Sequence, residues 1–181
     1  TSGGDAPGMN ACIRAILLTA SAGNMDVIGF KHGFNGLLEQ EYQTLHPHHV
    51  DNIIQRGGTI LKSARCPALE QPDGPVKAAA ILEQLNIDAL IVIGGDGSFR
   101  GTMAISKHYQ GQLIGVPGTI DNDVDGTDTT IGFATAIDTA LDAIDKIRDT
   151  ADAFERIFLV ELMGRHSGYL SLAAGIAGGA E

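Results

Sequence analysis

The sequence predicts an α/β fold, in which an open parallel sheet lies between two layers of helices. Two apolar runs rich in β-branched residues, 89–93 and 113–116, are typical of parallel strands that are buried on both faces. The segment between them, 99–109, has a helical pattern, so the three segments form a strand-helix-strand unit with a right-handed crossover. This unit is the predicted centre of a three-layer sandwich.

The other elements follow from apolar periodicity and from start and stop signals. Asn10 stands near the start of the first helix and Gly23 after its end, while Pro75 suits the first turn of another. Helices are predicted at 9–22, 50–55, 75–85, 129–149 and 167–176. Strands are predicted at 25–30, at 156–162 and, as a short edge strand, at 42–45.

A cluster of Asp, Gly and Thr at 124–132 marks the predicted domain boundary. Residues 1–128 are expected to form a Rossmann-like domain that lacks its first strand, and residues 129–181 the beginning of a second α/β domain. The opening loop calls for a strand before it, and the chain stops just after an apolar helical stretch. We therefore expect the sequence to be cut at both ends.

Composition excludes several classes of partner. The 12 basic and 22 acidic residues give a formal charge of −10, which disfavours nucleic acid and anionic membrane surfaces. An anionic substrate must then be held by a few well-placed arginines. The two cysteines, Cys12 and Cys66, lack metal-ligand spacing, which favours free thiols in a reducing cytoplasm.

The first candidate site is the loop Gly94-Gly95-Asp96-Gly97-Ser98. It lies between a predicted strand and a helix, so the N–H groups of Gly97 and Ser98 fall at a helix amino end, where the dipole favours phosphate. Asp96 brings a carboxylate to the same place, which calls for a cation such as Mg²⁺. A tight turn in which Asp or Ser caps the helix accounts for the same residues.

The second candidate site, Pro117-Gly118-Thr119-Ile120-Asp121-Asn122-Asp123, follows the neighbouring strand. In an extended segment Asp121 and Asp123 face the same side, and two like charges that close raise one pKa. One carboxylate then becomes a proton acceptor near neutral pH. A solvated Asx turn is the alternative, but parallel strands bring both acidic loops to one edge.

Three further features are less specific. The loop at 2–10 is rich in glycine but lacks the dinucleotide spacing, so it is either a phosphate contact or a plain turn. Arg165 follows a glycine beyond a predicted strand end, where an arginine fork suits phosphate. The trio His46, His48 and His49 is interpreted as a solvated loop, because no Cys or carboxylate stands at ligand spacing.

Together these motifs resemble bacterial ATP-dependent 6-phosphofructokinases nearly from end to end. The resemblance rests on 3–10, on Gly57-Gly58-Thr59 with Ser63-Ala64-Arg65, on the two acidic loops and on Met163-Gly164-Arg165. It implies transfer of the γ-phosphoryl group of ATP to the 1-hydroxyl of fructose 6-phosphate. It also implies Mg²⁺ as cofactor and a cytoplasmic homotetramer acting in glycolysis.

The resemblance also implies residue roles. Asp121 matches the base that accepts the hydroxyl proton, Thr119 and Arg165 match groups that stabilise charge, and Asp96 matches the metal-linked carboxylate. The ATP-binding positions are Gly4, Arg65, Cys66, Gly95, Asp96, Gly97 and Ser98. The sugar-phosphate positions are Thr119, Ile120, Asp121, Met163, Gly164, Arg165 and Arg156, the last matching an arginine donated across a subunit interface.

The effector site departs from the family pattern. Positions that match it are Arg14, Arg148, Gly179 and Glu181. Leu18 and Pro47 stand where the pattern that binds ADP or phosphoenolpyruvate has arginine. Regulation is therefore expected to differ from that pattern.

Other functions remain open at this point. In the pyrophosphate-using branch the positions of Gly97 and Gly118 carry aspartate and lysine, so glycine at both favours ATP. Lipid and NAD kinases share a Gly-Gly-Asp-Gly loop but lack the 117–123 motif. A non-catalytic nucleotide-binding module is the alternative from another class. The 181 residues alone are expected to have no useful turnover, because further sugar-phosphate ligands of the family lie beyond Glu181.

Overall fold

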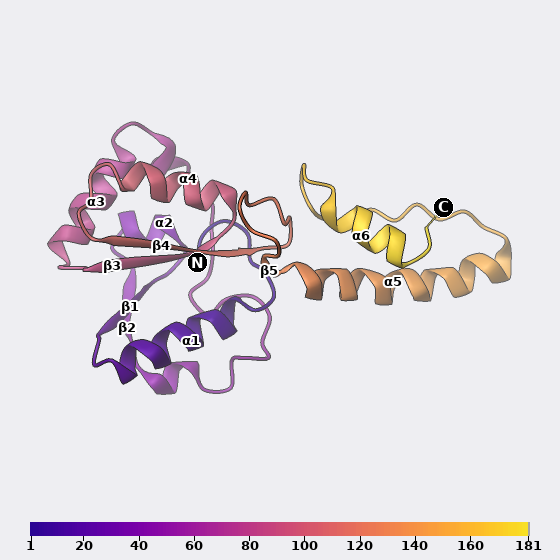
Figure 1. The fold of residues 1–181 in the computed structure, drawn as a ribbon, viewed down its shortest axis with the longest axis horizontal. Coiled ribbons are helices and arrows are strands. Elements are labelled where there is room, and N and C mark those ends of the chain that lie inside the picture. The colour runs from indigo at the N-terminus through magenta and orange to yellow at the C-terminus, as the bar shows by residue number, and fades with distance from the viewer. Residues whose placement is uncertain (181) are drawn as a thin grey trace.

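The computed structural model describes residues 1–180 (Figure 1). The helices are α1 (Met9–Ala22), α2 (Phe34–Leu38), α3 (Gly74–Gln84), α4 (Asp96–Ile105), α5 (Phe133–Phe154) and α6 (Tyr169–Ala177). The strands are β1 (Val27–Phe30), β2 (Tyr42–Leu45), β3 (Ala89–Gly94), β4 (Gln112–Thr119) and β5 (Ile131–Gly132). Two short 3₁₀ helices are η1 (Pro47–Val50) and η2 (Pro67–Glu70).

The predicted parallel sheet is confirmed. β3, β4 and β5 lie side by side in that order and run parallel, with Ala89 opposite Gln112 and Gly94 opposite Pro117. The strand predicted at 42–45 is present as β2, but it pairs antiparallel with β1 in a separate two-stranded sheet and is not an edge of the parallel sheet. The helix α4 connects β3 to β4, so the central strand-helix-strand unit is present.

Helices cover both faces of the sheet, which gives the expected three layers (Figure 1). Val92 and Ile93 are consecutive residues of β3, so their side chains point to opposite faces. Ile93 packs into a core with Met9 and other side chains of α1. Val92 packs into a second core with Leu82 of α3 and with residues of α4. The alternation along one strand therefore builds both layers of the core.

The helices α5 and α6 pack against each other at one end of the sheet, beyond β5 (Figure 1). Their contact is small and buries Ala140, Ile144 and Ala174. Small side chains let the two helix backbones approach closely, but they bury little apolar area. The α5–α6 pair thus buries a smaller hydrophobic core than the sheet domain does.

The strand predicted at 156–162 does not form. The segment has no ladder partner among residues 1–180, and Ile157 and Leu159 are 95% and 97% exposed. A strand exists only when a neighbour accepts and donates its backbone hydrogen bonds, and an apolar pattern cannot supply that neighbour. The prediction was wrong for the chain described here.

Two helix predictions also need correction. The helix expected at 50–55 is replaced by η1, which ends at Val50, and Asn52 adopts φ 55, a left-handed conformation that stops a helix. The short helix α2 was not predicted, because five residues with a central Gly36 carry no readable period. No helix within residues 1–180 is long and apolar enough to cross a membrane.

A matched pair of leucines tests this division into packed and unpacked segments. Leu82→Ala should lower the free energy of unfolding of the 181-residue chain by about 2–5 kcal/mol, because Leu82 is 0% exposed. Leu159→Ala, the same change at an exposed position, should change it by less than about 0.5 kcal/mol. Urea denaturation followed by circular dichroism measures both. Equal losses would contradict the packing described here.

Candidate active site

The site lies where β3 and β4 end. Gly94 stands opposite Pro117 in the parallel ladder, so the residues after each strand leave the sheet at one edge. A Cβ built on Gly95 would lie 3.4 Å from the Cβ of Thr119, which places the two acidic loops in contact. The structure therefore brings the Gly95–Ser98 loop and the Thr119–Asp121 loop together, as the strand pattern predicts.

The amino-terminal glycine loop joins them. The backbone N–H of Ser2 donates to the carbonyl of Ile93 at 3.0 Å, and the Ser98 hydroxyl donates to the carbonyl of Ser2 at 3.0 Å. Gly3 has φ +86, and a Cβ added to it would lie 3.4 Å from the Ser98 hydroxyl oxygen. Gly4 is exposed and has open space on its side-chain side. The loop thus runs past the start of α4 with room beside it for a ligand.

Ser98 supports this loop through its side chain and its backbone. Its hydroxyl is used by Ser2, and its backbone N–H donates to the carbonyl of Gly95 at 3.0 Å. The N–H of Ser98 is thus used within the first turn of α4. The N–H groups of Asp96 and Gly97 precede it in the same turn, at the positive end of the helix dipole.

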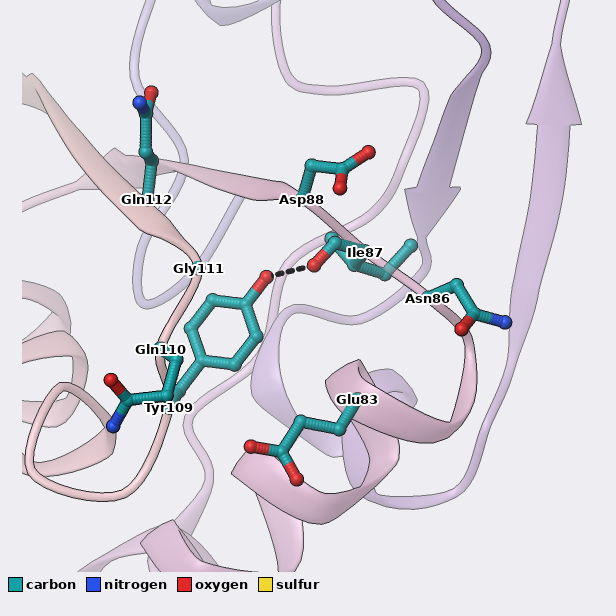
Figure 2. Close-up of a pocket in the computed structure, with 8 residues that line it drawn as sticks. All are labelled: Glu83, Asn86, Ile87, Asp88, Tyr109, Gln110, Gly111 and Gln112. Carbon is teal, nitrogen blue, oxygen red and sulfur yellow. Dashed lines mark hydrogen bonds between the residues drawn. The ribbon is translucent and has the colours of Figure 1, made fainter.

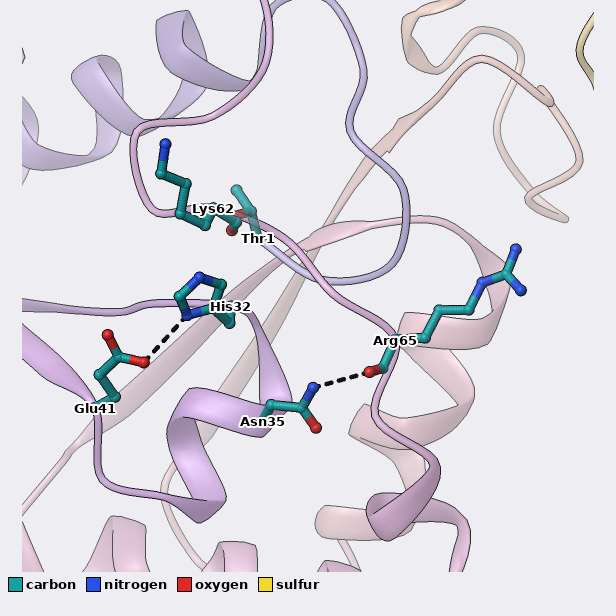
Figure 3. A network of polar contacts seen from close by, with 6 residues as sticks. All are labelled: Thr1, His32, Asn35, Glu41, Lys62 and Arg65. Atoms are coloured by element: carbon teal, nitrogen blue, oxygen red, sulfur yellow. Dashed lines mark hydrogen bonds and ion pairs between the residues drawn. The ribbon is translucent and has the colours of Figure 1, made fainter.

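The segment with Arg65 closes the same side of the site. The Ser63 hydroxyl donates to the carbonyl of Gly3 at 2.8 Å, and the Gly3 N–H donates to the carbonyl of Ala64 at 3.2 Å. The side chain of Asn35 in α2 donates to the carbonyl of Arg65 at 2.9 Å, and the Arg65 guanidinium extends away from this bond (Figure 3). Cys66 follows, half-buried, at the start of η2.

The predicted acidic pair is close, but for a different reason than the sequence pattern gives. The chain at 120–123 bends, and Asn122 adopts φ 50, so the segment is not extended. The Asp121 N–H donates to the Thr119 hydroxyl at 3.2 Å, which tightens the bend. A left-handed residue between the two aspartates replaces strand alternation as the cause of their proximity.

The environment of Asp121 favours its protonated form. The pKa of its carboxyl is raised, first by burial and second by the charge of Asp123, while the charge of Arg165 lowers it. No side chain or backbone group of residues 1–180 donates a hydrogen bond to this carboxylate. A half-buried carboxylate without donors is a good proton acceptor.

Thr130, which the sequence pattern does not mark as a functional residue, fixes the conformation of this loop through hydrogen bonds. Its side chain is 3% exposed, and its hydroxyl donates to the carbonyl of Thr119 at 2.6 Å. Its N–H donates to the side-chain oxygen of Asn122 at 2.9 Å. Thr130 immediately precedes β5, so the two bonds join the start of β5 to Thr119, the last residue of β4, and to Asn122 in the loop that follows. Thr130 stands in a run of Asp, Gly and Thr, which is also typical of an ordinary turn, so the sequence alone cannot reveal these hydrogen bonds.

The predicted sugar-phosphate positions lie on two segments of the chain, 119–121 and 156–165. Ile120 is partly buried and packs against the core on the α1 side. Gly164 is buried while Met163 and Arg165 are exposed, and the Ser167 hydroxyl donates to the carbonyl of Asp121 at 2.7 Å. The loop that carries Arg165 is thereby brought to the loop that carries Asp121.

Arg156 stands apart from the rest of the site. Its guanidinium carbon lies 5.0 Å from the ring centroid of Phe154, over the ring face, on an exposed segment. This is a cation–π contact at the surface. Within this chain Arg156 is not brought to the Asp121 loop.

The effector positions are only partly brought together. The Arg148 guanidinium donates to the carbonyl of Gly178 at 2.6 Å and lies against Gly179, so the ends of α5 and α6 meet there. Arg14 lies on α1, whereas Arg148 lies on α5. Glu181 lies outside the described residues.

The residues present fit a magnesium ion that nucleotide phosphates hold in part. One Asp96 oxygen pairs with the Arg100 guanidinium at 2.7 Å, and the half-exposed carboxylate has a second oxygen to offer. No group of three or more His, Cys, Asp or Glu side chains in residues 1–180 could hold a metal ion alone. Mg²⁺ in kinases is bound in this way, through one or two carboxylates and the substrate phosphates.

Two other features lie away from the strand carboxyl ends. A hollow of about 490 Å³ lies at the amino ends of β3 and β4, lined by Glu83, Asp88 and Tyr109 among others (Figure 2). Its lining contains no lysine or arginine, so it does not suit a phosphate. His46, His48 and His49 stack on one another at 4.1 to 5.7 Å between ring centroids, at the surface.

Comparison with known proteins agrees with this geometry. A family model described as phosphofructokinase matches residues 1–181. The ATP-dependent 6-phosphofructokinase 1 of Thermus thermophilus is 53% identical over 181 residues, which are 100% of this chain and 56% of that protein. The chain therefore spans little more than half the length of this relative.

Solved structures give the same family. Pichia pastoris phosphofructokinase in the T-state has a TM-score of 0.91 and 36% identity, over 99% of this chain and 21% of that chain. A pyrophosphate-dependent phosphofructokinase from Marinobacter aquaeolei has a TM-score of 0.81 and 25% identity, over 99% of this chain and 48% of that chain. The match covers every loop of the site described above, and the chain belongs to the phosphofructokinase family.

Proposed function

We propose that this chain is the catalytic amino-terminal part of an ATP-dependent 6-phosphofructokinase, which converts fructose 6-phosphate to fructose 1,6-bisphosphate in glycolysis. Residues 1–128 form the domain for ATP and magnesium, and residues 129–181 begin the substrate-binding domain. The observation that carries the proposal is the contact between the Gly95 and Thr119 loops beside an Asp121 carboxyl whose pKa is raised. Phosphate-binding N–H groups and a base are thereby held at one edge of the sheet.

Asp121 acts as the base. Its carboxylate accepts the proton of the sugar 1-hydroxyl while that oxygen bonds to the γ-phosphorus of ATP. The bond from the γ-phosphorus to the bridging oxygen breaks, and ADP leaves with the electron pair. The raised pKa of Asp121 brings its proton affinity closer to neutral pH, where such a base is most effective.

The other residues bind and orient the charged groups. Arg165 and Thr119 stabilise negative charge on the transferring group, and the N–H groups of Asp96 and Gly97 meet phosphate oxygens. Asp96 would hold Mg²⁺, which supplies neutralisation of phosphate charge. In a chain of net charge −10, these few cationic groups have to offset the repulsion of ATP and sugar phosphate.

The whole protein is proposed to be a cytoplasmic homotetramer. Arg156 lies outside the site of its own chain and carries an exposed guanidinium, which supports its donation to a neighbouring subunit. Ile157 and Leu159, next to it, are almost fully exposed and lack a strand partner within residues 1–180. Burial of these side chains in the assembled enzyme would remove their apolar surface from water and so stabilise the assembly.

ATP is the proposed donor in place of pyrophosphate. A side chain at Gly97 would point into open space at the start of α4, where the nucleotide phosphates are proposed to lie. An aspartate there would repel the α-phosphate of ATP. A side chain at Gly118 would meet Ile93 at 2.9 Å, so this position is closed by the core.

Replacing the base tests the reaction. In the full product of the gene that encodes these residues, Asp121→Asn should lower kcat by about 10²–10⁴-fold, because the amide cannot accept the hydroxyl proton. The KM for ATP should stay within about twofold, since the change removes a group used in the transition state. ADP release with fructose 6-phosphate measures both.

Asp128→Asn, an exposed aspartate of the same loop, is the matched control and should keep normal turnover. Magnesium-dependent ATP binding without phosphoryl transfer by the unaltered protein would support the nucleotide-binding module and overturn the proposed reaction. A kcat of Asp121→Asn within about threefold of the unaltered enzyme would remove Asp121 from the role of base.

The same substitution should stabilise the isolated 181-residue chain at neutral pH. Because the pKa of Asp121 is raised on folding, the protonated form favours the folded state, and that contribution is lost as pH rises through the folded pKa. The amide that replaces the carboxyl carries no charge at any pH, so Asp121→Asn should unfold at higher urea concentration than the parent at pH 7. The difference should vanish at a pH below the ordinary carboxyl pKa. A stability gain that is independent of pH would contradict the raised pKa.

A new charge at Gly97 tests the donor site. Gly97→Asp should weaken magnesium-dependent ATP binding by about tenfold, by repulsion between the added carboxylate and the phosphates. Pyrophosphate, which has no α-phosphate linked to a nucleoside, should be affected less. Titration calorimetry compares the two ligands, with Ser106→Asp at the other end of α4 as control. Unchanged ATP affinity would place the nucleotide elsewhere, and a preference of the unaltered protein for pyrophosphate would overturn the choice of donor.

A further inference from the structure

One hydroxyl group connects the turn that carries Arg165 to the loop that carries Asp121. The Ser167 hydroxyl donates to the backbone carbonyl of Asp121 at 2.7 Å. In the described part of the chain this is the one hydrogen bond between 156–180 and residues 1–132. The carbonyl of Gly164 lies 3.0 Å from the same hydroxyl and shares its single hydrogen. A half-buried serine is therefore placed between the two loops.

The bond fixes the turn that carries Arg165. The Ser167 N–H donates to the carbonyl of Gly164 at 3.1 Å, so residues 164–167 form a closed turn. Arg165 lies inside that turn in a left-handed conformation, with φ 55. The bond between Ser167 and Asp121 thus fixes the position of the whole turn, including the backbone of Arg165 from which its side chain extends.

Two simpler roles do not account for Ser167. It precedes Gly168, the N-cap residue of α6, but no side-chain hydrogen bond caps this helix. It is also only half-buried, so its side chain adds little to a core. The hydroxyl serves the contact between the loops.

We propose that Ser167 is a positioning residue, whose hydroxyl holds the Arg165 turn against the Asp121 peptide so that guanidinium and carboxylate act on the same transferring group. The role in turnover rests on the proposed function. The placement of Arg165 beside Asp121 does not rest on that function, because it is a property of the folded chain whether or not the chain transfers phosphate. The charge of Arg165 already acts on the Asp121 carboxyl, which agrees with this placement.

The first measurement needs no turnover. In the 181-residue chain, Ser167→Ala releases the turn, so the carboxyl loses part of the stabilisation that the Arg165 charge gives its ionised form. Carbon-13 NMR titration of Asp121 should then give a higher pKa than in the parent chain. Ser167→Thr, which keeps the hydroxyl, should restore the parent value, and Ser171→Ala on the exposed side of α6 should leave it unchanged. An identical pKa in Ser167→Ala and the parent would overturn the proposal.

The second measurement uses the full gene product. Ser167→Ala should lower kcat by about tenfold and move the acid limb of kcat/KM to higher pH, while the KM for ATP stays within about twofold. A loss of thermal stability with an unchanged acid limb would mean a merely structural role and would overturn the inference. Absence of phosphoryl transfer in the unaltered protein would instead overturn the proposed function, and the NMR titration would still decide the role of Ser167.

Discussion

The parallel register between β3 and β4 is the constraint on which the site depends. With Gly94 opposite Pro117, both strands end at one edge, and the small residues that follow let the loops approach to van der Waals distance. A shift of one residue would turn every side chain of β3 to the other face. Ile93 and Val92 prevent it, because each is buried in a different core. The two hydrophobic layers therefore fix the geometry of the polar site.

The candidate site contains few cationic groups although its proposed ligands are anions. The chain carries a net charge of −10, yet the proposed substrates are themselves anions. The site offers helix N–H groups, a few arginines and a carboxylate suited to Mg²⁺ rather than a broad basic surface. Burial and, second, the charge of Asp123 raise the pKa of the Asp121 carboxyl, which costs stability when the group is ionised and suits the base proposed here.

Much of this arrangement could be predicted from the sequence, and the failures have a common cause. The runs at 89–93 and 113–116 became neighbouring parallel strands, because a doubly buried strand leaves a continuous apolar pattern. The apolar run at 156–162 has the same pattern but no partner within residues 1–180, so it stayed without a ladder. Asn122, Thr130 and Ser167 act through a few local hydrogen bonds or one backbone angle, which leave no period in a sequence.

The central claim is that the loops at Gly4, Gly97 and Thr119 bind one metal-nucleotide complex. Paramagnetic broadening of backbone amide NMR signals by Mn²⁺ with ATP, in the 181-residue chain, tests it most directly. We expect the signals of all three residues to broaden together and to recover when Mg²⁺ replaces Mn²⁺. Broadening centred on His46, His48 and His49, or its absence at Thr119, would contradict a shared site at the ends of β3 and β4.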